Sequence, residues 1–147
     1  MIDQSHIGFE LPETAADVEA GQLKFFAKAV GEKNPVYFDE DAARAAGHPA
    51  LPAPPTFLFS LGLLAPSKVS FLDVIGVDIG RVLHGEQQFS YRKQIYAGDR
   101  ITMKSKVTDI YAKKGGALEF VVQETVATNQ HGETVGTSRS VTVVRNV

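Results

Sequence analysis

Three side chains that could take part in acid–base chemistry lie close together in the sequence: Glu32, Asn34 and Tyr37. Proton transfer at neutral pH needs a group that titrates near pH 7 and a carboxylate to orient it. Glu32 can supply the carboxylate, but the ordinary pKa of a tyrosine is about 10, so Tyr37 would be a poor base. A purely structural interpretation also fits, in which Asn34-Pro35 breaks a helix, Glu32 is a surface charge and Tyr37 is a half-buried aromatic.

A second set of candidates lies at the start of the most apolar segment, which continues to Ala65 with apolar side chains on nearly every side. Pro55 suits the first turn of a helix, and the free N–H groups of Thr56 or Phe57 could polarise a carbonyl. His84, on a later predicted strand, is either structural or part of the same ligand site. These four residues, Pro55, Thr56, Phe57 and His84, are the candidate substrate-binding residues.

Other kinds of chemistry have no support in the sequence. The chain contains no cysteine, which excludes disulfides, thiolate metal sites and a cysteine nucleophile. Its four histidines show no metal-ligand spacing, and no phosphate-binding loop or Gly-x-Ser-x-Gly motif is present. Lys and Arg are spread along a chain whose net charge is −2. We therefore expect no metal, no cofactor and no nucleic-acid partner.

Two predicted helices position the acid–base candidates. Apolar residues recur at helical spacing over 18–30, and Gly31 followed by Asn34-Pro35 ends that helix. A shorter helix is predicted to begin after Asp39, a suitable N-cap, and to end at Gly47, which can adopt a left-handed conformation.

From Val82 onward, polar and apolar residues alternate as in strands, with turns at 97–99, 113–116 and 129–133. The single apolar helix and this long antiparallel meander predict an α+β domain in which the sheet wraps around a long central helix. Such a sheet leaves edge strands and a helix face uncovered, which favours a dimer.

Size and composition place the chain among ordinary globular domains. Its 147 residues are about one domain, so residues 1–147 are interpreted as a single unit, and 44% hydrophobic and 22% charged residues exclude disorder. The first residues do not resemble a signal peptide, and the longest apolar run is far too short to span a bilayer. We expect a cytoplasmic protein that does not associate with membranes.

The segment from Phe26 to Tyr37 resembles the hydratase motif of the MaoC-like family of (R)-specific enoyl-CoA hydratases and 3-hydroxyacyl-thioester dehydratases. That motif reads aromatic, a few small or variable residues, Gly-Asp-x-Asn-Pro-aliphatic-His, and a small residue six positions later. The chain keeps the non-catalytic positions of the motif at Phe26, Gly31, Asn34, Pro35, Val36 and Ala43. It replaces the family's catalytic Asp with Glu32 and the catalytic His with Tyr37.

Two further segments, 53–57 and 82–99, resemble the N-terminal, non-catalytic branch of the same family. This branch includes the partner subunits of mycobacterial (3R)-hydroxyacyl-thioester dehydratases. The resemblance implies a hot-dog fold over nearly the whole chain. It also places Pro54 and Pro55 where catalytic members have a His-Gly pair, whose glycine N–H polarises the thioester carbonyl. Proline has no N–H to donate, so this second device is also missing.

The resemblance therefore implies an acyl-thioester-binding subunit of an (R)-specific enoyl-CoA hydratase or 3-hydroxyacyl-thioester dehydratase. Its ligand would be an acyl-CoA or an acyl carrier protein thioester, and the apolar helix favours a fatty or sterol-side-chain acyl group. Hydro-lyase activity would require a heterodimer with a catalytic MaoC-like subunit. Three alternatives remain: a self-sufficient hydratase homodimer using Glu32 with a residue such as His84, a non-enzymatic acyl-CoA-binding dimer, and a thioesterase on the same fold.

Overall fold

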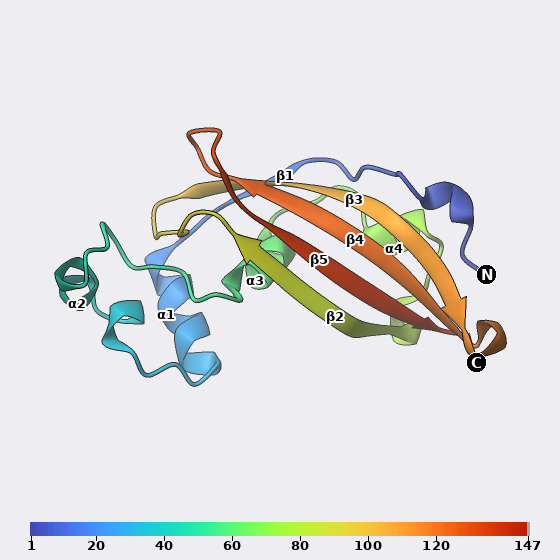
Figure 1. The fold of residues 1–147 in the computed structure, drawn as a ribbon, viewed down its shortest axis with the longest axis horizontal. Helices are drawn as coiled ribbons and strands as arrows, with labels where there is room; N and C mark the ends of the chain where they lie inside the picture. Colours follow the sequence, from blue (N-terminus) through green and yellow to red (C-terminus); the bar gives the residue numbers. More distant parts are fainter. Residues whose placement is uncertain (147) are drawn as a thin grey trace.

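A strongly twisted antiparallel sheet of five strands dominates the structure, a computed structural model that describes residues 1–146 (Figure 1). The strands are β1 (Thr14–Asp17), β2 (Val82–Tyr91), β3 (Arg100–Lys113), β4 (Leu118–Thr128) and β5 (Thr134–Arg145). The predicted α+β class is confirmed, and the four long strands lie where the alternation of polar and apolar residues predicts them. Among residues 1–146, no helix is both long and apolar enough to cross a membrane.

The pairing of β2 differs from the predicted meander. Strands β3, β4 and β5 pair in chain order, but β2 pairs with β5, so the sheet order is β1-β3-β4-β5-β2. The connection from β2 to β3 runs over residues 92–99, which is too long for a tight hairpin turn and crosses the end of the sheet instead. As a result, β2 forms one edge of the sheet and the short β1 forms the other.

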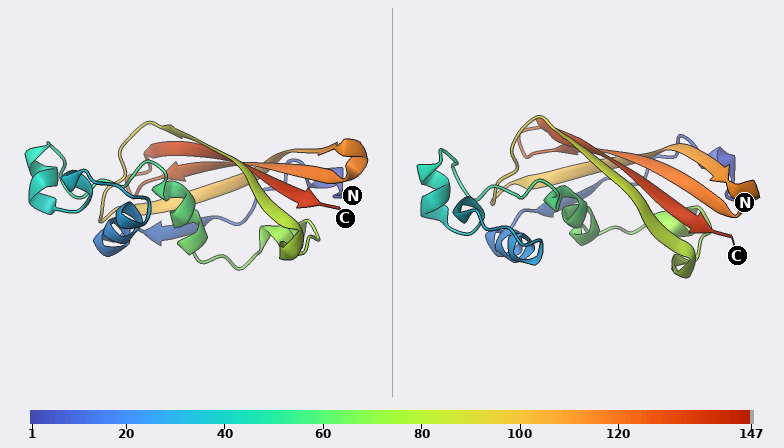
Figure 2. Two further views of the ribbon diagram at one scale, coloured as in Figure 1. Left: turned by 90° about the horizontal axis from the view of Figure 1, so that it is seen from below. Right: turned by 60° about the horizontal axis from the view of Figure 1, so that its bottom comes forward.

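The helices lie on one face of the sheet or beyond its end (Figure 2). The longer ones are α1 (Ala20–Ala29), α2 (Glu40–Ala45) and α3 (Phe57–Leu64); the short ones are α4 (Phe71–Val74) and the 3₁₀ turns η1 (Gln4–His6), η2 (Pro35–Tyr37), η3 (Ile79–Arg81) and η4 (Lys114–Gly116). The predicted boundaries of α2 and the predicted end of α1 are confirmed, whereas α1 begins at Ala20 and not at the predicted Val18. Gly31 follows α1 with a φ of 76°, and the Asp39 carboxylate caps α2 by accepting from the Ala42 N–H at 2.7 Å.

The central helix α3 has only eight residues, so the prediction of a long central helix is wrong. Prolines limit it on both sides: Pro54 and Pro55 lie before the N-cap residue Thr56, and Ala65, which precedes Pro66, is extended. Pro55 therefore lies outside the first turn of α3 rather than within it.

Two apolar clusters form the core between the helices and the sheet. The larger cluster surrounds the buried side chains of α3, which are Phe57, Leu58 and Leu61. The smaller cluster lies near α4 and includes Ile75, Val107, Val121 and Val144. Only one side of α3 is covered, because Phe59, Leu63 and Leu64 are 37%, 73% and 54% exposed.

A buried carboxylate joins the two ends of the chain at the end of the sheet remote from α1 and α2 (Figure 1). Glu119, which is 3% exposed, accepts hydrogen bonds from the Ile2 N–H at 2.7 Å and from the Asn146 amide at 2.6 Å. Burial alone would raise the pKa of Glu119, but these hydrogen bonds outweigh it and hold the pKa below its ordinary value of 4.5.

We predict that Glu119→Gln lowers the free energy of unfolding by about 1–3 kcal/mol at pH 7, because an ionised acceptor for two buried donors is lost. A depressed pKa contributes stability above the unfolded pKa and loses it as the pH falls through the folded value. The difference between variant and wild type should therefore shrink below pH 4.5. Urea unfolding at pH 7 and at lower pH measures both effects, and an equal difference at every pH would contradict this account.

Candidate functional site

The loop after α1 holds the side chain of Glu32 in a local hydrogen-bond network. One carboxylate oxygen, Oε1, accepts from the Lys33 N–H at 2.8 Å and from the Asn34 N–H at 3.0 Å. These two bonds, the one from Asn34 being the stronger influence, lower the pKa of Glu32 below its ordinary value. Glu32 is therefore ionised at neutral pH and is a weaker base than an unperturbed glutamate.

Asn34 is the N-cap of the short turn η2 directly after this loop, and Tyr37 is the last residue of that turn. The Asn34 side-chain oxygen caps the turn by accepting from the Val36 N–H at 3.2 Å, and Pro35 occupies its first position. Tyr37 is half-buried. Asn34 thus acts as a capping residue in one chain, which agrees with the structural interpretation of the Asn-Pro pair.

The motif segment is connected to the central helix through two aromatic rings. Phe26 of α1 packs edge-on against Phe57, the first residue of α3, with ring centroids 5.4 Å apart. Phe57 is almost fully buried and Phe26 partly so. The structure therefore brings Phe26, the aromatic residue of the motif, into contact with Phe57, one of the predicted substrate-binding residues.

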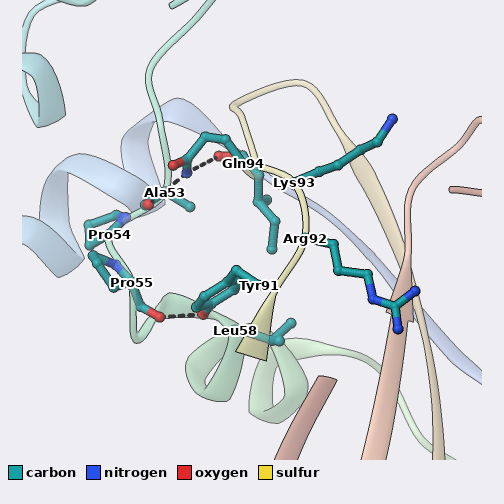
Figure 3. A pocket seen from close by; sticks show the side chains of 9 residues that line it. Ala53, Pro54, Pro55, Leu58, Tyr91, Arg92, Lys93 and Gln94 are labelled. Carbon is teal, nitrogen blue, oxygen red and sulfur yellow. Dashed lines mark hydrogen bonds between the residues drawn. The ribbon is translucent and has the colours of Figure 1, made fainter. Parts of the chain in front are cut away.

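The proline segment before α3 is clamped to the end of β2 and the loop that follows (Figure 3). The Tyr91 hydroxyl donates to the carbonyl of Pro55, and the Gln94 amide donates to the carbonyls of Ala53 at 3.0 Å and Ile95 at 2.9 Å. Burial raises the pKa of Tyr91 to about 12, so its hydroxyl stays protonated and remains a donor at neutral pH. A cavity of about 280 Å³ lies between these side chains and the prolines.

The start of α3 offers few free donors to a carbonyl. Pro54 and Pro55 have no N–H, and the N–H of Phe57 already donates to the Pro54 carbonyl at 3.0 Å. Thr56 and Phe57 were the two predicted N–H donors to a ligand carbonyl. Because the Phe57 N–H is already bonded, we retain only Thr56 as a proposed donor.

His84 lies on β2, against the exposed side of α3. Its ring meets that of Phe59 edge-on, with centroids 4.9 Å apart. The first half of β2 and the loop after α1 lie toward opposite ends of the molecule in all views (Figures 1 and 2). One chain therefore does not bring His84 and Glu32 together as an acid–base pair.

An open apolar groove of about 610 Å³ separates α1 from α3. Phe25, Leu63 and Leu64 line it, and Phe25 is 76% exposed. An apolar surface of this kind, on a helix without a polar face, marks an interaction site. Within residues 1–146, no group of three or more His, Asp or Glu side chains is arranged to hold a metal ion.

Comparison with known proteins identifies the family. Residues 5–138 match the family model of the FAS1-like dehydratase domain region. The chain belongs to this family. It is 42% identical over 118 residues to a UPF0336 protein of Streptomyces coelicolor, covering 80% of this chain and 79% of that protein. It is also 38% identical over 145 residues to a UPF0336 protein of Saccharopolyspora erythraea, covering 98% and 92%.

Solved structures confirm the predicted hot-dog fold and the MaoC-like resemblance. The HadBC (3R-hydroxyacyl-ACP dehydratase) complex from Mycobacterium tuberculosis contains a chain that superposes with a TM-score of 0.78 and 27% identity, covering 94% of this chain and 96% of that one. A MaoC-like dehydratase superposes with a TM-score of 0.83 and 25% identity, covering 96% of this chain and 42% of the other.

Sequence reasoning did not identify Tyr91 or Gln94 as part of the site. Their partners Pro55 and Ala53 lie 36 and 41 positions away, and the contact arises only because the loop from β2 returns to the start of α3. The alternation pattern assigned Tyr91 to a strand but contained no signal for this contact.

We predict that Tyr91→Phe lowers the free energy of unfolding by about 0.5–1 kcal/mol, because the Pro55 carbonyl loses its donor. In a spectrophotometric titration, the variant should also lose the ionisation near pH 12 that the structure assigns to Tyr91. Tyr111→Phe is the control, because the Tyr111 ring stacks on Phe120 and keeps that contact without its hydroxyl. Unchanged titration of Tyr91→Phe would contradict the assignment.

Proposed function

We propose that this chain is the acyl-thioester-binding subunit of a cytoplasmic (R)-specific enoyl-CoA hydratase or 3-hydroxyacyl-thioester dehydratase. Its catalytic partner would be a second MaoC-like hot-dog subunit with an intact Asp and His. The family relationship supports hydratase or dehydratase chemistry in general, and the division of labour between two subunits is the proposed part.

The observation that carries the proposal is the state of the motif loop. The only carboxylate of the motif, Glu32, is occupied by two backbone N–H groups of its own loop, and its pKa is lowered rather than raised toward neutrality. The position of the catalytic histidine is taken by Tyr37, a phenol. The Pro54-Pro55 segment provides no N–H for the thioester carbonyl. Three separate requirements for catalysis are thus unmet in one chain.

The uncovered surface supports a partner. The exposed side of α3 continues into the edge strand β2, where Leu83 is 48% exposed. An edge strand with unpaired backbone groups beside an exposed apolar helix is a surface that a second hot-dog subunit can cover. The HadBC structure is a complex, which supports a heteromeric arrangement for this chain.

The decisive measurement is hydration of crotonyl-CoA, followed by loss of the enoyl-thioester absorbance. We expect background rates with the purified chain alone, and enzymatic rates when it is co-purified with a MaoC-like protein that carries Gly-Asp-x-Asn-Pro-aliphatic-His. Replacing the partner's motif Asp should abolish the activity of the mixture. Ordinary enzymatic rates from the chain alone would show that the proposed division of labour is wrong.

Glu32→Gln separates this proposal from the self-sufficient hydratase. We expect the hydration rate of the mixture to change by less than about twofold, because Glu32 holds its own loop and transfers no proton. Glu32→Ala, which removes both loop hydrogen bonds, should lower the melting temperature more than Glu32→Gln, which keeps an acceptor oxygen. A loss of activity of a hundredfold or more in Glu32→Gln, without a loss of folding, would favour the alternative.

The non-enzymatic acyl-CoA-binding dimer makes a different prediction. It requires acyl-CoA binding with no turnover in any pairing, so activity in the mixture would exclude it.

A further inference from the structure

The face of the sheet that carries no helix holds a row of large apolar side chains. The helices that pack on the sheet lie against its opposite face (Figure 2). His84 belongs to that covered face, because its ring contacts Phe59 of α3. Since side chains alternate along a strand, the neighbouring Leu83 points to the open face, and so do the residues aligned with Leu83 across the sheet. These are Val143, Phe120 and Tyr111, one from each of the other three long strands.

Three further apolar residues extend this row along the strands. Val122 and Val141 pair with each other in the next outward-facing row, and Leu118 lies outward on the other side, two residues before Phe120. We refer to the resulting set of seven residues as the outer apolar patch: Leu83, Tyr111, Leu118, Phe120, Val122, Val141 and Val143. Within the patch, Val122 and Val141 are buried, Leu83 is exposed and the other four are partly exposed.

The patch is unexpected on an open sheet face, which ordinarily carries polar residues. The same face returns to that rule in the following row, which consists of Gln88, Arg139, Glu124 and Lys106. Tyr111 and Phe120 are also ordered in advance, because their rings stack 4.8 Å apart with only 3° between their planes. Covering rings that are already fixed costs little side-chain entropy. A contiguous apolar patch on an otherwise polar face indicates an interaction surface.

Charges of opposite sign flank the two margins of the patch. Lys113 and Arg145 align with Leu118 at one margin, and the Lys113 ammonium lies 5.1 Å from the centre of the Phe120 ring. Asp109 and Glu124 lie at the other margin and also face outward. In the part of the chain that the structure describes, none of these four charged side chains forms an ion pair. The patch therefore has a cationic and an anionic margin that are both free to pair.

A two-fold axis makes this surface complementary to itself. Two sheet faces pack well when both twist in the same sense, a condition that two identical faces always meet. An axis perpendicular to the strands, through the patch, turns the cationic margin of one copy over the anionic margin of the other. Four strands and six residues of strand length cover about 14 Å by 20 Å. This area is at the small end for specific interfaces, so the association should be reversible.

We propose that the outer apolar patch joins two copies of this chain back to back, with the cationic margin of each copy over the anionic margin of the other. Apolar contact supplies the attraction, and the two margins fix the orientation. The patch lies on the face of the sheet opposite α3, so this inference does not depend on the proposed function. A chain that also binds a catalytic subunit through α3 would form a dimer of heterodimers.

Sedimentation velocity of the full chain at increasing concentration tests the proposal. The wild type should pass reversibly from a 15.9 kDa monomer to a dimer. Phe120→Lys should weaken the dimer at least about tenfold, because an ammonium would be buried against an apolar surface. Leu63→Lys is the matched control, since it changes an exposed residue of α3 on the other face and should dimerise like the wild type. A wild type that stays monomeric, or a dimer that is lost in Leu63→Lys and kept in Phe120→Lys, would overturn the proposal.

A charge exchange tests the two-fold arrangement with variants that need not disturb the fold, because Lys113 and Glu124 are both exposed. Lys113→Glu and Glu124→Lys should each weaken the dimer about fivefold, since the symmetry doubles the effect of each change. The double variant should recover most of the lost affinity, because opposite charges face each other again. Glu40→Lys, the same charge change on α2, should have no effect. Circular dichroism checks that each variant is folded, and unaffected single variants or a double variant weaker than both would refute the back-to-back pairing.

Discussion

An eight-residue helix makes too few backbone hydrogen bonds to persist in water, so α3 is helical because Phe57, Leu58 and Leu61 are buried against the sheet. The buried helix in turn fixes the positions of the segments that contact it. Phe26 packs on Phe57 and so orients α1 and the motif loop, while the hydrogen bonds of Tyr91 and Gln94 hold the segment before the helix. The side of α3 that the sheet does not cover is the surface available to a partner.

Local features of the fold were predictable from the sequence because their physical causes are local. Gly31, Asp39 and the Asn34-Pro35 pair each act within a few residues, through a left-handed conformation, a side-chain cap and a fixed φ. The length of α3 could also have been inferred from the prolines on both sides. The pairing of β2 with β5 could not, because an alternating pattern shows that a segment is a strand without showing which neighbour it selects.

The candidate site was predictable to the extent that it depends on the identity of single residues. The replacement of the catalytic Asp and His by Glu32 and Tyr37 is visible in the sequence. The capture of the Glu32 carboxylate by its own loop is not, since it depends on the backbone path. Register shifts between Val107 and Asp109 and between His84 and Glu86 are not visible in the sequence either, although they change which residues face inward along β3 and β2.

The contacts of Glu119 bear on whether the chain could be circularly permuted. Because it holds Ile2 and Asn146 together, the two ends of the chain lie side by side at the end of the sheet opposite α1 and α2 (Figure 1). A short linker could join them, and the chain could be reopened at the exposed turn over 130–132 without separating any pair of strands. The architecture is thus compatible with circular permutation, and new termini at that turn would still leave every element that contacts α3 in place.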